Sequence, residues 1–143
     1  GGEALAEVIV ELQQLSRLDL ALAGNSLGAK GTKALAAAVA ELRQLSSLTL
    51  VLPRNGMGDT GGRALAAAWS ELRQLSALTI SLAGNGLGEE GGKALAGAAL
   101  ELRQLSSLEL DLRRNDIGDE ARTGFCRAQS WLEKRGARVM LHF

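Results

Sequence analysis

Apolar residues follow two alternating spacings along this chain. The first spacing is of two residues, in Leu48, Leu50 and Leu52. It places these three side chains on one face of a short strand and leaves Thr49 and Val51 on the other face. The pattern therefore predicts a strand with one buried face.

A spacing of three and four residues follows each predicted strand, and it is typical of one face of a helix. The positions that show it after the strand at 48–52 are Ala64, Leu65, Ala68, Trp69, Leu72 and Leu75. Each unit of the chain is thus expected to contain a strand, a turn and a helix.

The whole pattern returns every thirty residues, so that segment 41–70 aligns without gaps with segment 71–100. The same frame extends back to residue 11 and forward from residue 101. We predict a single repeat domain over 1–143. Its parts are a first unit at 1–17 that is helix only, full repeats at 18–47, 48–77 and 78–107, and a last repeat with a C-terminal cap strand at 108–143.

One strand and one helix leave both flanks of their apolar surface open, so the units must stack to bury their leucines. Neighbouring strands pair in parallel at about 4.8 Å, while helices need about 10 Å each. This mismatch in width predicts an α/β solenoid in a horseshoe arc, with parallel strands on the concave face and helices on the convex face.

The pattern LxxLxLxLxxNxLGxxGxxALA at residues 75–96 resembles the leucine-rich repeat. Its helical half resembles the ribonuclease-inhibitor class, which includes repeats of Ran GTPase activators and of nucleotide-binding innate immune receptors. This chain departs from that class by two extra residues before the asparagine. The resemblance implies a leucine-rich repeat solenoid, and it allows a role in regulating a GTPase or another enzyme.

An asparagine occupies the same turn of every unit, at Asn25, Asn55, Asn85 and Asn115. These side chains could be ligands, but their recurrence favours a structural ladder. In such a ladder each buried amide bonds the backbone of its own turn and of the next turn.

Two stretches, 56–61 and 86–91, match the GxGxxG pattern of dinucleotide-binding turns. The equivalent stretches at 26–31 and 116–121 break this pattern, so we interpret the glycines as parts of the repeat turn. Acidic residues at the helix starts, such as Asp59 and Glu89, suit the helix dipole and would repel a pyrophosphate. No cofactor is expected.

Composition narrows the function further. Sixteen basic and sixteen acidic residues cancel, which disfavours nucleic acid as a partner, and apolar stretches of about seven residues disfavour membrane insertion. His142 and Cys126 are the only residues of their types, so they form no catalytic set and no metal cluster, and we expect no enzyme. The single cysteine favours a reducing compartment, and an organelle reached with a removed transit peptide also fits.

The concave face offers the best candidate binding surface, because its side chains point away from the core. A partner could instead contact the helices or the ends of the stack. The candidate residues are Asp19, Ala21, Thr49, Val51, Thr79, Ser81, Glu109, Asp111, Arg113, Met140 and His142.

The two ends of the stack differ. At the C-terminus we expect a helix at 120–134, a stop at Gly136, and a strand with Val139, Leu141 and Phe143 facing inward. Trp131 belongs either to this cap or to an exposed anchor. At the N-terminus a helix comes first, so the strand at 18–22 is an open edge that further repeats or another subunit would cover.

These features predict a non-catalytic scaffold that binds a protein partner or joins a larger protein complex. One alternative is an architectural subunit, or a fragment of a larger assembly, docked through its uncapped N-terminal edge. A second is a regulator of a GTPase or another enzyme.

Overall fold

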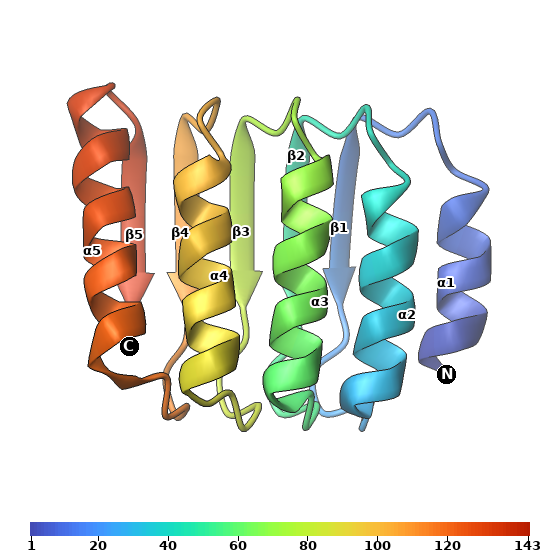
Figure 1. The fold of residues 1–143 in the computed structure, drawn as a ribbon. Coiled ribbons are helices and arrows are strands. Elements are labelled where there is room, and N and C mark those ends of the chain that lie inside the picture. The colour runs from blue at the N-terminus through green and yellow to red at the C-terminus, as the bar shows by residue number, and fades with distance from the viewer.

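The computed structural model describes all 143 residues, in which five helices alternate with five strands (Figure 1). The helices are α1 (Gly2–Val10), α2 (Gly28–Ala40), α3 (Gly58–Glu71), α4 (Glu89–Glu101) and α5 (Gly118–Lys134). The strands are β1 (Arg17–Ala21), β2 (Ser47–Val51), β3 (Ala77–Ser81), β4 (Ser107–Asp111) and β5 (Arg138–His142).

All five strands pair in parallel in the order β1-β2-β3-β4-β5. Leu18 pairs with Leu48, and Leu48 with Leu78, so the thirty-residue register of the sequence is the register of the sheet. The helices form a second layer along one face of the sheet and leave the other face uncovered (Figure 1). The predicted alternating α/β solenoid is confirmed.

The core lies between the sheet and the helices. Leu48, Leu50 and Leu52 are no more than 1% exposed, as their two-residue spacing predicts. On the helix side Leu65 and Trp69 are equally buried. At about 25 cal/mol per Å² of buried apolar surface, such columns supply most of the driving force for folding.

The helical spacing continues beyond the helix itself, which the sequence interpretation did not anticipate. Helix α3 ends at Glu71, yet Leu72 and Leu75 are both buried. The Leu72 amide donates to the Trp69 carbonyl at 3.0 Å, and the Leu75 amide donates to the Leu72 carbonyl at 3.1 Å. Two successive three-residue turns therefore keep these leucines directed inward after the helix has ended.

The asparagines connect each repeat to the preceding one, whereas the sequence interpretation assigned the contact to the next turn. Asn85 Oδ1 accepts a hydrogen bond from the Asn55 amide at 2.8 Å. Its Nδ2 donates to the carbonyls of Leu52 at 2.8 Å and Leu82 at 2.9 Å. The Nδ2 of Asn25 donates only within its own turn, to the Ala23 carbonyl.

The glycines of the GxGxxG stretches serve the turn and the packing of adjacent helices. Gly56 and Gly58 have φ angles of 63° and 57°, in the left-handed region that favours glycine. At Gly62, a Cβ atom would lie 3.2 Å from Gly91 Cα and 2.7 Å from a methyl carbon of Leu87. A side chain at Gly62 would therefore force helices α3 and α4 apart.

Asp59 has a role that its place in the first turn of α3 does not reveal. Its Oδ1 accepts hydrogen bonds from the Gly88 amide at 2.7 Å and the Gly91 amide at 2.9 Å. Both amides belong to the N-terminus of α4, which has no side-chain cap of its own. One repeat thus caps the helix of the next.

The C-terminal end is formed by α5 and by β5, the strand predicted as a cap. The Gly136 amide bonds the Glu133 carbonyl and the Ala137 amide bonds the Leu132 carbonyl, which is the hydrogen-bond pair of a Schellman motif. Val139 and Leu141 pack on the core and are partly buried. Phe143 lies beyond the strand with its ring 5.8 Å from that of Phe125, but it remains 37% exposed.

Trp131 lies within this cap and is partly buried against the core. The guanidinium groups of Arg135 and Arg103 lie 4.8 and 5.9 Å from the centre of its ring. Both distances are within the range of cation–π contacts.

The N-terminal end exposes apolar side chains whose equivalents elsewhere are buried. Val8 is 60% exposed and Leu12 is 43% exposed. Thirty residues later, Ala38 and Leu42 are 5% and 0% exposed, because the helix of the following repeat and the helix before it cover them from both sides.

The ladder predicts that removing an asparagine destabilises the fold by an amount that depends on its position in the stack. Replacing Asn85 with leucine leaves the buried Asn55 amide without its acceptor, which costs about 2–3 kcal/mol. The midpoint of thermal unfolding, followed by circular dichroism, should fall by roughly 5–10 °C. The matched change Asn25→Leu removes one exposed bond and should cost less than about 0.5 kcal/mol. Equal losses in the two variants would contradict the ladder.

The cap between repeats predicts a difference between two equivalent carboxylates. Asp59→Ala removes the acceptor for two amides of α4 and should cost about 1 kcal/mol in urea unfolding. Asp119 holds the same position in α5 but bonds no following helix, so Asp119→Ala should cost a few tenths of a kcal/mol through the helix dipole alone. A cost at Asp59 no larger than at Asp119 would argue against the cap.

Candidate protein-interaction surface

The uncovered face of the sheet carries the candidate residues in two rows that run across the strands. The first row is Asp19, Thr49, Thr79, Glu109 and Met140, and the second is Ala21, Val51, Ser81, Asp111 and His142. Each residue is in direct register with its neighbours in the row. Adjacent side chains are therefore held about 4.8 Å apart by strand pairing.

The side chains in the middle of this face are small and uncharged. They include Thr49, Thr79 and Ser81, which are partly buried between their neighbours. Charge appears at both ends. Asp19 pairs with Arg17 of its own strand at 2.9 Å, and Glu109 is exposed on β4. A partner would meet a nearly neutral central strip with an acidic group on either side.

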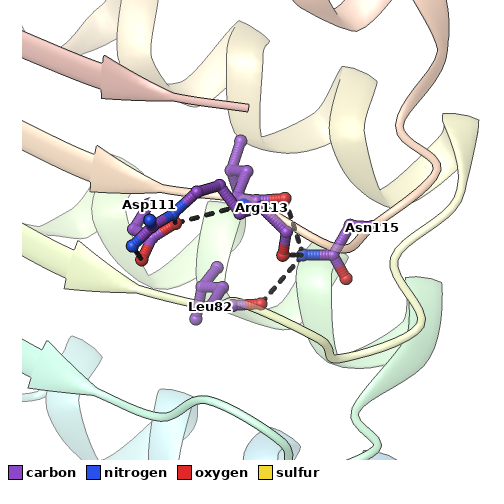
Figure 2. Close-up of polar contacts among 5 residues, drawn as sticks. Leu82, Asp111, Arg113 and Asn115 are labelled. Carbon is purple, nitrogen blue, oxygen red and sulfur yellow. Dashed lines mark hydrogen bonds and ion pairs between the residues drawn. The ribbon is translucent and has the colours of Figure 1, made fainter.

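Asp111 and Arg113 form a tight pair where β4 ends (Figure 2). Arg113 donates from Nε to Oδ1 and from a terminal nitrogen to Oδ2 of Asp111, both at 2.9 Å. Its backbone amide also donates to Oδ1 at 3.1 Å. These hydrogen bonds hold the pKa of Asp111 below its usual value against the opposing effect of partial burial, and Asp111 in turn raises the pKa of Arg113.

The last asparagine of the ladder fixes the backbone beside this pair (Figure 2). Asn115 Nδ2 donates to the carbonyls of Leu82 at 2.9 Å and Leu112 at 3.0 Å, with a longer bond of 3.4 Å to the Arg113 carbonyl. The strand ends are therefore held in place by the same hydrogen bonds that join the repeats.

A cavity of about 490 Å³ opens beside the candidate rows, at the C-terminal ends of β1 to β4. It is lined by Ala23, Gly24, Pro53, Arg54, Ala83, Gly84, Arg113 and Arg114. Of these, the sequence interpretation named only Arg113 as a candidate. In parallel α/β sheets the carboxyl ends of the strands are the usual position of ligand sites.

Arg54 and Arg114 are the functional candidates that the sequence interpretation missed. They occupy the position before the ladder asparagine, where the other two repeats carry Gly24 and Gly84. All four residues have positive φ angles, of 56° and 59° for the two arginines. The alternation of glycine and arginine at one repeat position was the signal in the sequence.

Cys126 and His142 lie on different elements, and only His142 belongs to the candidate rows. Cys126 is exposed on α5, and His142 is on the edge strand β5. No group of three or more histidine, cysteine, aspartate or glutamate side chains is placed to hold a metal ion. No helix is both long and apolar enough to cross a membrane.

The Asp111–Arg113 pair predicts a pH dependence of stability. Because the pKa of Asp111 is lowered on folding, the stabilisation is complete above the unfolded pKa near 4 and disappears as the pH falls through the folded value. In urea unfolding, the free energy of unfolding of wild type should exceed that of Asp111→Asn by a constant amount from pH 7 to pH 5. This difference should shrink below pH 4.

Arg113→Gln removes the partner that lowers the pKa of Asp111. The loss in free energy of unfolding of this variant relative to wild type should therefore also shrink below pH 4. A deficit in either variant that stays constant down to pH 3 would contradict the proposed role of the pair.

Comparisons with known proteins agree with this architecture. The family model described as Leucine Rich repeat matches residues 44–66, 78–96 and 104–126. Comparison with curated proteins found no significant match.

Among solved structures, the chain is similar to the tropomodulin C-terminal domain of Caenorhabditis elegans. The TM-score is 0.73 at 14% identity, over 99% of this chain and 83% of that one. It is also similar to the structure titled Leiomodin-1 Actin-Binding Site 2, with a TM-score of 0.69 at 13% identity, over 96% of this chain and 77% of that one. The matched segments, the parallel sheet with one helix per strand and the asparagine turns together show that the chain contains leucine-rich repeats.

Proposed function

We propose that this chain is a non-catalytic scaffold that binds a protein partner through the uncovered face of its sheet. The observation that carries the proposal is the contrast between the two faces, since helices cover one and no element covers the other (Figure 1). A partner on the open face would meet two rows of side chains at a fixed spacing. Such preorganisation lowers the entropic cost of binding.

The comparisons support a protein as the class of partner. One structural neighbour carries actin binding in its title. At 13% identity that likeness extends to the fold alone, so we carry over only the idea that this architecture binds proteins. The neutral net charge of the chain further favours a protein over a polyanion.

A second candidate function is architectural, with the N-terminal end as the contact surface. Its support is the exposure of Val8 and Leu12, in columns that the inner repeats bury completely or nearly so. In addition, β1 pairs only with β2, so its other edge offers free backbone groups to an added strand, as does the free edge of β5 at the opposite end. The proposed occupant is a leucine-rich unit, either a further repeat or part of another subunit, whose matching columns would cover these side chains.

One capture experiment separates the two candidates. The tagged chain is used to capture partners from its native source, and the captured proteins are quantified by mass spectrometry. Thr49→Lys with Thr79→Lys places two charges in the neutral strip and should weaken capture at least tenfold, about 1.4 kcal/mol. Ala37→Lys with Ala67→Lys, at exposed helix positions thirty residues apart, is the matched control and should bind as wild type does.

A third variant, Val8→Glu with Leu12→Glu, tests the N-terminal end. If this variant loses the partner and Thr49→Lys with Thr79→Lys retains it, the architectural role replaces the scaffold proposal. If all three variants capture the same proteins as wild type, both proposals are wrong.

A further inference from the structure

The cavity at the strand ends combines a small, apolar floor with a basic rim. The floor is formed by Ala23, Pro53 and Ala83, which occupy the same position in three successive repeats. Arg54, on the turn after β2, and Arg114, on the turn after β4, contribute to the rim. The two arginines are two repeats apart, so their backbones lie about 10 Å from each other by strand spacing.

The two arginines differ from Arg113 in having no acidic partner. Arg113 is held by Asp111, but the guanidinium groups of Arg54 and Arg114 make no hydrogen bond or ion pair anywhere in the molecule. Both are exposed. The rim therefore carries two uncompensated positive charges on a chain whose net charge is zero.

The backbone at these positions is costly for arginine. A left-handed conformation costs a residue with a side chain roughly 1–2 kcal/mol relative to glycine. Gly24 and Gly84 adopt the same conformation without this cost, at φ angles of 64° and 66°. Strained residues that line a pocket point to a use for their side chains.

The Arg54 side chain runs beside the glycine of the next repeat. A Cβ atom at Gly84 would lie 3.5 Å from Arg54 Cγ, so the stem of Arg54 rests against the bare backbone of the next repeat. It leans across repeat three in the direction of Arg114. A side chain at position 84 would meet this stem.

We propose that this cavity binds an extended acidic segment of the protein partner, with one carboxylate on Arg54 and another on Arg114. The inference rests on the proposed function. An arginine fork suits a carboxylate because it can donate two parallel hydrogen bonds. In a polyproline II conformation, residues three apart lie on the same side about 9 Å from each other, which is close to the separation between the backbones of the two arginines.

A nucleic acid fits the same charges less well. Neither the cavity lining nor strands β1 to β4 contain an aromatic side chain on which a base could stack. The small floor formed by Ala23, Pro53 and Ala83 instead accommodates a peptide backbone.

The test uses the full ¹⁵N-labelled chain and two blocked eight-residue peptides of alanine and glycine. One contains two glutamates three positions apart, and the other has glutamine at both sites. In NMR titrations the glutamate peptide should shift the amide signals of Gly24 and Gly84 in a saturable way. The glutamine peptide should bind at least tenfold more weakly.

The critical variant is Arg54→Gly with Arg114→Gly, which installs the residue that the other two repeats carry and so preserves the turn. It should weaken binding of the glutamate peptide at least tenfold. Lys33→Gln with Arg63→Gln removes the same charge from exposed helix positions and should leave binding unchanged. Equal binding of the two peptides, or undiminished binding by the glycine variant, would overturn the inference.

Two further arms separate this inference from its alternatives. Tighter binding of a single-stranded eight-nucleotide DNA than of the glutamate peptide would overturn it in favour of a nucleic acid. Thr49→Lys with Thr79→Lys should still bind the peptide. Peptide binding without partner capture on the strand face contradicts the scaffold proposal alone, and capture without peptide binding contradicts this inference alone.

Discussion

Each repeat of this protein can bury its leucines only against the repeats beside it, and the thirty-residue register makes this possible. Leu48 meets Leu18 on one side and Leu78 on the other, so every inward column is continuous from β1 to β4. The asparagine ladder maintains the register, because Asn85 bonds the backbone of two successive turns at once. A shift of one residue would break the ladder and expose the leucine columns together.

The same constraint positions the candidate surface. Asn115 bonds the backbone that carries Arg113, and Asp59 fixes the start of α4 from the preceding repeat. Hydrogen bonds of the fold therefore hold the strand ends, and ligand contacts at those ends need little further ordering. This arrangement favours tight recognition by a few side chains, since less conformational entropy is lost on binding.

The sequence predicted the repeat, the layers and the facing of the strand residues, because each depends on spacing alone. It did not predict where α3 ends, since the spacing of Leu72 and Leu75 is the same in a helix as in two short turns. The direction of the asparagine bonds was also wrong, because a period is the same when read in either direction. Asp59 was interpreted through its own helix, whereas its acceptor role depends on how closely α3 and α4 approach at Gly91.

The rim of the cavity illustrates a different limit. Arg54 and Arg114 were visible in the alignment of the repeats, but an exposed arginine in a turn is common on any protein surface. The role proposed for these two arginines rests on three features of the structure, which are the left-handed backbone, the shared cavity and the absence of acidic partners.

The position before the ladder asparagine has one consequence for how such a surface can change. Its backbone conformation is set by the repeat, and both glycine and arginine are compatible with it in this chain. A single substitution there alters the number and spacing of charges along the row and leaves the stack intact. Ligand preference can therefore diverge between copies of this architecture one repeat at a time, through a position on which the leucine core does not depend.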